Sequence, residues 1–276
     1  MIRQAIIPLA GLGTRLLPIT SVFPKELLLI NGKPGIEYIL DECIDAGIKE
    51  IVFIISKKKE LIKRYFNNDQ FYQKIIKKKK DSRLKNEYKK ILKYKNMIRF
   101  VYQNNPKGTG DAVLKAKNII KDKFFLMLLP DDLIIKRNCS KDMVSLHNKK
   151  KCSIMASMIV SKKTISRWGI YSKKSLIDKK NFYIKDVIEK PSIKTAPSNN
   201  AVIGRYILPK KIFSKLNKQK KGKGGEIHIT DAIRNLIRDG ELFIGHTFKG
   251  KYLDCGTMNG YIKSSQEISK IWSYAW

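Results

Sequence analysis

The sequence predicts an α/β fold, a Rossmann-like doubly wound mixed sheet, mainly parallel, with helices on both faces and a small β-hairpin region. Short apolar runs of β type alternate with longer segments of helical pattern, which indicates a sheet covered on both sides. After about Val160 the alternation changes to hairpin-like pieces. At 276 residues the chain is near the upper limit for one core, so a single domain is expected.

The predicted strands of the first half are short and almost continuously hydrophobic. That pattern favours strands buried on both faces. In chain order the candidates are Gln4 to Leu9, Ile51 to Ile55, Ile98 to Gln103, Phe124 to Leu129 and Ile154 to Val160.

Helices are expected between these strands. A helix from Gly35 to Ala46 follows Pro34 and stops at Gly47, as helix boundary residues predict. Two further segments, Asp111 to Lys121 and Ser140 to Lys150, carry apolar residues at helical spacing.

The second half is predicted to contain shorter elements. Hairpin-like pieces at Trp168 to Tyr171 and Phe182 to Ile188 precede a strand from Val202 to Leu208. Helices are expected at Ile229 to Arg238 and Asn259 to Ser273. Within one domain we therefore separate residues 1–160, residues 161–256 and a C-terminal helical segment, 257–276.

The formal net charge of +33, from 57 Lys and Arg against 24 Asp and Glu, raises a nucleic-acid hypothesis. Eleven basic residues crowd into Lys74 to Lys95, and smaller groups lie at Lys149 to Lys151 and Lys218 to Lys223. All lie in polar stretches, so we interpret them as solvated surface and expect no specific nucleic-acid partner. The segment Lys74 to Lys95 is expected to be a helical surface excursion between the second and third strands.

Cysteine and histidine spacing gives no support for a zinc site, because there is no C-x-x-C pair and no zinc-protease pattern. Reduced, partly buried thiols are expected. No apolar run approaches the roughly 18 residues that span a bilayer. The segment Ala5 to Leu12 is interrupted by Pro8 and Gly11, unlike a signal peptide. We expect a cytoplasmic protein without a membrane partner.

A glycine-rich turn follows the first predicted strand and suits a phosphate. Ala10-Gly11-Leu12-Gly13 is followed by Thr14 and Arg15, so backbone N–H groups can approach anionic oxygens and a guanidinium is near. A dinucleotide-binding fingerprint needs a third glycine where this chain has Leu16, and the pattern G-x-x-x-x-G-K-[ST] is absent. The G-x-G pattern alone is equally consistent with a plain tight turn.

The continuation favours a binding site. Leu17-Pro18 and then Phe23-Pro24-Lys25-Glu26-Leu27 hold the chain extended and return a lysine to the same place. Together, Gly11 to Arg15 and Pro24 to Glu26 resemble the signature of the sugar-1-phosphate nucleotidylyltransferases, in particular the bacterial UTP:glucose-1-phosphate uridylyltransferases, or UDP-glucose pyrophosphorylases.

Further segments agree with that family in the same order and cover nearly the whole chain. They are Asn31-Gly32-Lys33-Pro34, Gln103 with Lys107-Gly108-Thr109-Gly110, Leu129-Pro130-Asp131-Asp132, Trp168-Gly169, Val187-Ile188-Glu189-Lys190-Pro191, Ala196-Pro197-Ser198-Asn199, Gly204-Arg205-Tyr206, Glu226-Ile227, Thr230-Asp231-Ala232 and Asp254-Cys255-Gly256.

The resemblance implies transfer of a uridylyl group from UTP to glucose 1-phosphate, giving UDP-glucose and pyrophosphate, with Mg²⁺ as cofactor. The sugar phosphate attacks the α-phosphorus in line, so catalysis depends on positioning and on placed charge. Residues 1–160 would bind the nucleotide and residues 161–256 the sugar phosphate.

The alternatives are a thymidylyltransferase or cytidylyltransferase on a sugar 1-phosphate, a non-catalytic relative, and a basic RNA-binding protein. Tyr88 and Tyr94 alone make a poor stacking platform for RNA.

By resemblance, one group of residues binds the nucleotide and its phosphates. Arg15 takes the departing phosphates, and Lys25 bridges the phosphates of the two substrates, where a compact ammonium fits well. The backbone cradle comprises Ala10, Gly11, Leu12, Gly13 and Thr14, while Glu26, Gln103 and Gly108 are assigned to uracil.

The resemblance also implies a sugar-phosphate group and a metal pair. Glu189 accepts hydrogen bonds from sugar hydroxyls, Lys190 meets the sugar's phosphate, and Gly169 opens the backbone to the sugar. Asp131 and Asp254 would bind Mg²⁺, and Asp131 follows a buried strand at the edge where open α/β sheets bind ligands. Asp132 competes with Asp131, because spacing cannot rank two adjacent carboxylates. The family's metal position favours Asp131.

The end of the chain carries two tryptophans, Trp272 and Trp276. We expect them to pack against another surface, such as that of a second subunit, and we expect a homo-oligomer.

Overall fold

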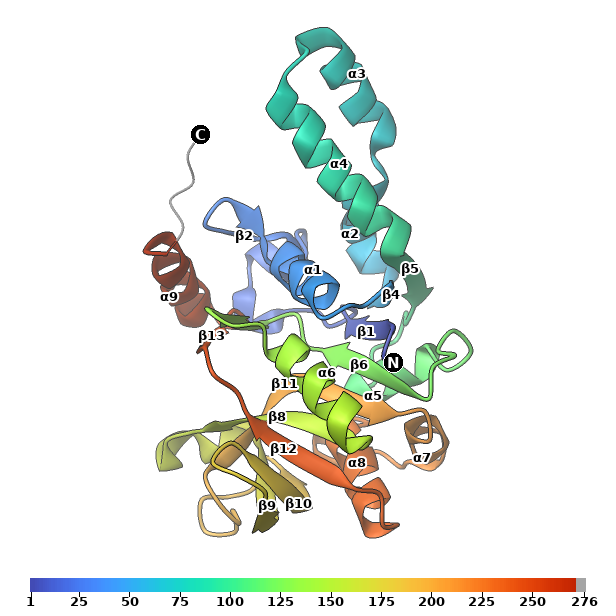
Figure 1. Ribbon diagram of the computed structural model, residues 1–276. Coiled ribbons are helices and arrows are strands. Elements are labelled where there is room, and N and C mark those ends of the chain that lie inside the picture. Colours follow the sequence, from blue (N-terminus) through green and yellow to red (C-terminus); the bar gives the residue numbers. More distant parts are fainter. Residues whose placement is uncertain (272–276) are drawn as a thin grey trace.

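The computed structural model describes residues 1–271, the side chain of Lys223 excepted. Its centre is a nine-stranded sheet in the order β5-β4-β1-β6-β11-β8-β12-β10-β9 (Figure 1). The expected mixed α/β class is confirmed. Strand β11, from the second half of the chain, lies between β6 and β8 of the first half, so both halves share one sheet.

The first part of the sheet is parallel. It contains β1 (Gln4–Pro8), β4 (Glu50–Ile55), β5 (Ile98–Tyr102) and β6 (Phe124–Leu128). From β1 the chain moves outward to β4 and β5, then returns to place β6 on the other side of β1. The loops that leave β1 and β6 therefore separate at a switch point, where open sheets commonly bind ligands.

The rest of the sheet is mostly antiparallel. It contains β8 (Ser153–Ile159), β9 (Gly169–Leu176), β10 (Asn181–Glu189), β11 (Asn200–Pro209) and β12 (Phe243–Thr247). Only the β8–β12 pair is parallel among these, whereas β11 runs against β6, β8 and β9, and β10 runs against β9 and β12. The expectation of a mainly parallel sheet is wrong for this half, because continuous hydrophobicity reports burial and not strand direction.

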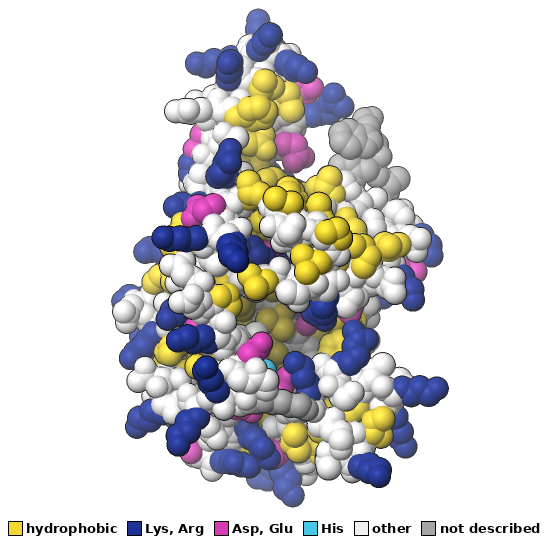
Figure 2. Space-filling model, turned by 180° about the vertical axis from the view of Figure 1, so that it is seen from behind, with side chains coloured by type: hydrophobic (Ala, Val, Ile, Leu, Met, Phe, Trp, Pro, Cys, Tyr) yellow, Lys and Arg dark blue, Asp and Glu magenta, His cyan; other side chains and the backbone are white. Residues whose placement is uncertain are grey.

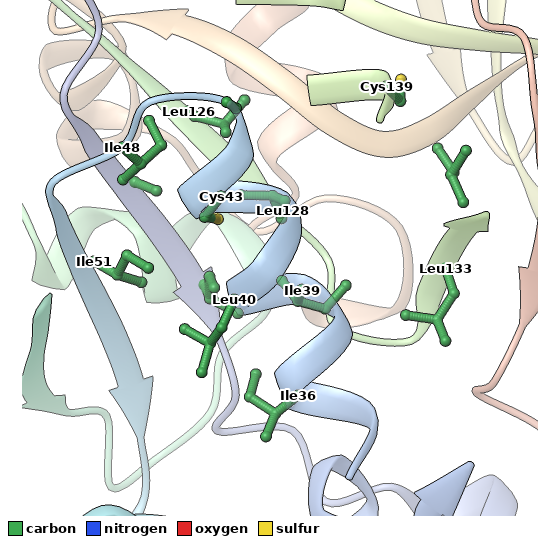
Figure 3. Close-up of a cluster of buried hydrophobic side chains, with 14 of the residues drawn as sticks. Ile36, Ile39, Leu40, Cys43, Ile48, Ile51, Leu126, Leu128, Leu133 and Cys139 are labelled. Atoms are coloured by element: carbon green, nitrogen blue, oxygen red, sulfur yellow. The ribbon is translucent and has the colours of Figure 1, made fainter. Parts of the chain in front are cut away.

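Helices cover both faces of the sheet. On one face lie α1 (Gly35–Asp45) and α6 (Cys139–Lys150), and on the other α5 (Thr109–Lys115), α7 (Ile212–Lys218) and α8 (Ile229–Arg238). In Figure 3, Ile36, Ile39, Leu40 and Cys43 of α1 belong to the core that also contains Leu126 of β6. Their spacing places them on one helical face. The helix expected at Asp111 to Lys121 is shorter and ends at Lys115.

The lysine-rich segment is a helical excursion, as expected. Between β4 and β5 the chain forms α2 (Glu60–Asn67), α3 (Asp69–Lys79) and α4 (Ser82–Met97), and the pair α3–α4 projects away from the sheet (Figure 1). Strand β5 beside it is a sheet edge with exposed residues. Its expected burial on both faces is wrong, because Arg99 and Tyr102 are exposed and the other three residues of β5 are only partly buried.

Short elements complete the fold. Strand β7 (Asp132–Ile135) pairs antiparallel with β13 (Lys251–Asp254), β2 (Leu29–Ile30) pairs with β3 (Lys33–Pro34), and α9 (Met258–Ser269) follows β13. Short 3-10 helices span Thr14–Leu16, Ile19–Ser21, Lys25–Leu27, Lys57–Lys59, Lys162–Arg167 and Lys223–Gly225. The expected C-terminal helix is confirmed up to Ser269, while Trp272, Ser273 and Trp276 lie outside the described residues. Within residues 1–271, every helix is too short or too polar to cross a bilayer.

Candidate active site

A cavity of about 810 Å³ opens where the loops after β1, β5 and β6 meet residues of β10, β11 and β13. All the residues to which the family resemblance gave a role line this cavity, although they come from distant parts of the chain. They are Ala10, Gly11, Leu12, Gly13, Thr14, Arg15, Lys25, Glu26, Gln103, Gly108, Asp131, Gly169, Glu189, Lys190 and Asp254.

The glycine-rich turn after β1 presents its backbone to this cavity. Gly13 has φ 69°, in the left-handed region, and its carbonyl accepts a hydrogen bond from Thr20 Oγ1 at 2.9 Å. A Cβ on Gly13 would lie 3.2 Å from Thr20 Cγ2, whereas a Cβ on Gly11 would meet no atom within 4 Å. The turn is thus fixed on its inner side and open on the other, which leaves room for an anion beside the backbone.

Two basic side chains face Asp131, which follows β6. Lys25 Nζ lies 2.7 Å from Asp131 Oδ2, and Arg15 Nη2 lies 3.4 Å from the same oxygen. Burial alone would lower the pKa of Lys25, but the carboxylates of Asp131 and Glu26 outweigh it, so the pKa of Lys25 is raised. Lys25 therefore carries a positive charge at the inner wall of the cavity.

Asp131 itself is held as an anion. Burial alone would raise the pKa of its carboxyl group, but the Lys25 ammonium and the hydrogen bond from it lower that pKa below the ordinary value. Such a carboxylate can give up its contact with the Lys25 ammonium and bind a metal ion instead, so it can bind the two cations one after the other.

Asp131 and Asp254 are brought together by β13. The backbone N–H of Cys255 donates to the carbonyl of Asp131 at 2.8 Å, and the N–H of Gly256 donates to Asp254 Oδ1 at 2.9 Å. A Cβ on Gly256 would lie 2.6 Å from Asp131 Oδ2, so only glycine leaves this space clear. Arg167 Nη2 lies 3.2 Å from Asp254 Oδ2.

The donor chemistry at this place fits a hard divalent cation. Within residues 1–271 no cluster of three or more His, Cys, Asp or Glu side chains has the arrangement of a metal cage. Two carboxylates suit an ion that takes its remaining ligands from water and substrate phosphates, as Mg²⁺ commonly does. Asp131 and Asp254 are the residues that would hold it.

Asp132, the competing candidate, is already occupied by protein donors. Its Oδ1 accepts from the Tyr252 hydroxyl at 2.7 Å and its Oδ2 from the Gly204 N–H at 2.9 Å. Burial, and then the neighbouring charge of Asp131, raise the pKa of Asp132 to about 6. The carboxyl group of Asp132 thus joins β7, β11 and β13, and this geometry favours Asp131 as the metal ligand.

A buried arginine beneath the loop was not assigned a role from the sequence. Arg205 on β11 has an exposed fraction of 0% and forms hydrogen bonds to both Glu42 carboxylate oxygens at 2.9 and 2.8 Å. Its other donors reach the carbonyls of Leu129 at 3.2 Å and Asp132 at 2.6 Å. Arg205 therefore fixes the backbone on both sides of Asp131. A charged residue inside an otherwise apolar strand was the available signal.

The opposite wall carries the residues expected to bind the sugar phosphate. Thr230 Oγ1 donates to Glu189 Oε2 at 2.5 Å, which orients the carboxylate from the end of β10. Lys190 follows with φ 45° and stays about half exposed at the cavity. A Cβ on Gly169 would lie 3.2 Å from a methyl group of Val202 and 3.4 Å from Glu189 Oε2, so glycine keeps this wall open.

The residues assigned to the base come from separate segments of the cavity wall. Gln103 donates from Nε2 to Asp111 Oδ2 at 2.5 Å. Gly108 has φ 108°, and a Cβ there would lie 2.7 Å from the carbonyl oxygen of Ile227. Glu26 accepts hydrogen bonds from Lys59 Nζ at 2.8 and 2.6 Å in a buried pair. The carboxylate of Glu26 is therefore shared with a lysine that the sequence had not indicated.

Sequence reasoning missed several other residues of the cavity wall. Arg167, His228 and Thr230 line it beside the assigned residues. Arg167 stands next to the motif residue Trp168, and Thr230 belongs to the motif Thr230-Asp231-Ala232 but was given no role, so both positions carried a signal that was not used.

Comparison with known proteins gives a consistent result over the whole chain. The chain is 36% identical over 269 residues to the UTP–glucose-1-phosphate uridylyltransferase of Mycoplasma pneumoniae, covering 96% of this chain and 91% of that protein. A crystal structure of UDP-glucose pyrophosphorylase complexed with UDP-glucose superposes with a TM-score of 0.88 at 36% identity, covering 99% of this chain and 100% of the other.

A UTP-bound UGPase from Acinetobacter baumannii gives a TM-score of 0.88 at 31% identity, covering 99% of this chain and 95% of the other. The family model described as nucleotidyl transferase matches residues 4–271. With the glycine-rich turn, the paired aspartates and the basic side chains assembled around one cavity, the chain belongs to the nucleotidyl transferase family.

Proposed function

We propose that this protein transfers a uridylyl group from UTP to glucose 1-phosphate, forming UDP-glucose and pyrophosphate in a Mg²⁺-dependent reaction in the cytoplasm. The observation that carries the proposal is the cavity itself, which is lined by every residue to which the resemblance gave a role, from Ala10 to Asp254. The named relatives, similar over nearly their full length, support UTP and glucose 1-phosphate as the substrates.

The nucleotide phosphates lie over the turn from Ala10 to Thr14, which offers backbone donors. Lys25 and Arg15 both reach Asp131 in this structure, so their charged ends already lie where the phosphates and the metal meet. Lys25 stabilises the negative charge that grows as the bond to pyrophosphate breaks, and Arg15 holds the departing phosphates. When bound to Asp131 and Asp254, Mg²⁺ supplies further positive charge to the phosphate oxygens.

Glucose 1-phosphate occupies the opposite wall. Glu189, oriented by Thr230, accepts hydrogen bonds from sugar hydroxyls, and Lys190 meets the sugar's phosphate. Gly169 gives the sugar access to the backbone. Holding the phosphate oxygen in line with the α-phosphorus is the main contribution of these residues, since the reaction needs no protein nucleophile.

The uracil base lies beside Gln103, Gly108 and Glu26, which line the cavity. Residues 1–160 thus serve the nucleotide and residues 161–256 the sugar phosphate. The subunits form a homo-oligomer, which light scattering of the purified protein would test.

The basic charge of the protein does not favour a nucleic-acid function. Figure 2 shows Lys and Arg side chains in several separate places on the visible face, with hydrophobic side chains gathered across its middle. Basic residues do gather along α3–α4, but Tyr94 there is buried and Tyr88 stacks on Tyr72, so these rings make a poor stacking platform for nucleobases. Electrostatic attraction of polyanionic substrates is the expected effect of this charge.

The test is pyrophosphate release from glucose 1-phosphate with UTP, dTTP, CTP or ATP, each with and without Mg²⁺. We expect UTP to be the best donor, CTP and ATP to be strongly rejected, and dTTP to be rejected less, because thymine has the same hydrogen-bonding edge as uracil. Faster reaction with dTTP than with UTP would replace the proposal by a thymidylyltransferase. The absence of pyrophosphate release with all four nucleotides would overturn the proposal.

A further inference from the structure

Gln103 is held by the protein at both its backbone and its side chain. It follows β5, is 3% exposed and lines the cavity. Its backbone N–H donates to the carbonyl of Ile55 at 2.7 Å, which ties it to β4. Its side-chain Nε2 donates to Asp111 Oδ2 at 2.5 Å. Asp111, in the first turn of α5, lies behind Gln103 and does not line the cavity.

The Asp111 carboxylate decides which end of the amide faces it. A carboxylate only accepts hydrogen bonds, so it pairs with the NH₂ end of glutamine and repels the carbonyl end. Asp111 is 7% exposed, and Lys115 Nζ lies 3.8 Å from its other oxygen. Turning the amide by 180° would bring two buried acceptors together and break the hydrogen bond, which is strongly unfavourable.

The carbonyl end of Gln103 is thereby left for a ligand. Among residues 1–271, no hydrogen bond to Gln103 Oε1 is formed, and that oxygen is not enclosed by protein. A donor on the bound base can therefore reach it, with the second N–H of Nε2 in a fixed position beside it.

We propose that Asp111 is a positioning residue that fixes the Gln103 amide so that the site selects uracil over cytosine. The proposal rests on the proposed function, in which Gln103 faces the base. Uracil presents a donor, N3–H, beside an acceptor, O4, and cytosine presents an acceptor, N3, beside a donor, the N4 amino group. A flipped amide would exchange its own donor and acceptor and would suit cytosine instead. The orientation set by Asp111 thus determines which base finds its groups paired.

The variant Asp111→Asn tests this directly, because it keeps the size of the side chain and adds a donor. Asn can pair with either end of Gln103, so the amide becomes free to turn. We expect the ratio of kcat/KM for UTP to that for CTP to fall about tenfold or more, mainly through improved use of CTP. Calorimetric measurement of UTP and CTP binding without sugar phosphate should show a smaller difference between the two Kd values than in the wild type.

Two controls separate orientation from general damage. The double variant Gln103→Ala, Asp111→Asn should have the same ratio of kcat/KM for UTP to that for CTP as Gln103→Ala alone, because no amide remains to be oriented. Asp142→Asn changes an aspartate on α6 that is ion-paired with Arg137, and it should leave the ratio as in the wild type.

The outcomes distinguish the two proposals. If the wild type prefers UTP but Asp111→Asn lowers kcat/KM equally for UTP and CTP, Asp111 only stabilises α5 and this inference is overturned. An unchanged ratio with both nucleotides used normally also overturns it. If the wild type does not use UTP, the proposed function fails, and this inference falls because it rests on that function.

Discussion

Lys25 Nζ lies 2.7 Å from Asp131 Oδ2, although the two residues are 106 positions apart in the chain. This pair joins the loop after β1 to the loop after β6, on the two sides of the switch point in the sheet. The shifts in pKa keep Lys25 positive and Asp131 negative in this contact. One residue is thus ready to bind phosphate oxygen and the other to bind a cation.

Lys25→Ala is expected to lower turnover far more than UTP affinity. The ammonium stabilises charge that develops only in the transition state, so kcat should fall by roughly 100-fold or more while the Kd for UTP changes little. Steady-state kinetics and calorimetric binding of UTP measure the two quantities. As a control, Lys211→Ala removes a lysine that is paired with Glu241 and does not line the cavity, and its kcat should match the wild type. Turnover of Lys25→Ala within a few-fold of wild type would remove Lys25 from the mechanism.

Asp131→Asn is expected to fold normally and to lose its response to Mg²⁺. The amide keeps the shape of the side chain but lacks the charge that binds the ion. The measurement is activity, and separately UTP binding, over a Mg²⁺ titration, with circular dichroism to check folding.

Asp132→Asn is the matched neighbour, and the structure predicts a different defect. The two carboxylate oxygens of Asp132 accept hydrogen bonds from Tyr252 and Gly204. In Asp132→Asn only one of these atoms is an acceptor, so the NH₂ group would face one of the two donors. Its unfolding midpoint should therefore fall while the Mg²⁺ dependence of the remaining activity is kept. If Asp132→Asn loses the Mg²⁺ response and Asp131→Asn retains it, the choice between the neighbours is wrong.

The lysine-rich pair α3–α4 is predicted to contribute to substrate capture only through its general charge. Lys77, Lys78 and Lys79 are exposed at the end of α3. Replacing all three by Gln should leave kcat unchanged and lower kcat/KM only at low salt, because exposed charges are screened beyond about 10 Å at 0.1 M salt. Kinetics at two ionic strengths measure this. A loss of activity that is independent of salt would indicate a specific site on this excursion.

The sequence predicted the buried strands and the residues that line the cavity better than the small elements. Strands such as β1 and β6 differ from expectation by one residue, because apolar runs bounded by glycine or proline report burial clearly. The pair β7–β13 was missed, since four residues give little periodicity. That pair sets Asp254 opposite Asp132 and so completes the site.

The side-chain partners of the site residues were the other part that the sequence could not show. The motifs located Glu26 and Gln103 correctly at the cavity, but the side chains that hold them, Lys59 and Asp111, lie in other segments. Neither belongs to a spacing pattern that links it to its partner. Hydrogen-bond partners of this kind follow from the strand order, which hydrophobic patterns do not determine.

The buried pair Arg205–Glu42 is predicted to be essential for stability and, through the loop after β6, for metal binding. Arg205→Met removes one charge and leaves Glu42 buried without its partner, which typically costs about 3–5 kcal/mol in the free energy of unfolding. Glu42→Gln leaves the arginine charge unpaired and should destabilise the protein to a similar degree, whereas the double variant should lose less than the sum of the two. Chemical denaturation measures the three values.

Because Arg205 also holds the carbonyls of Leu129 and Asp132, any folded fraction of Arg205→Met should need more Mg²⁺ for half-maximal activity. Additive losses in the double variant, with an unchanged Mg²⁺ requirement, would show that the pair neither acts as a unit nor positions the loop.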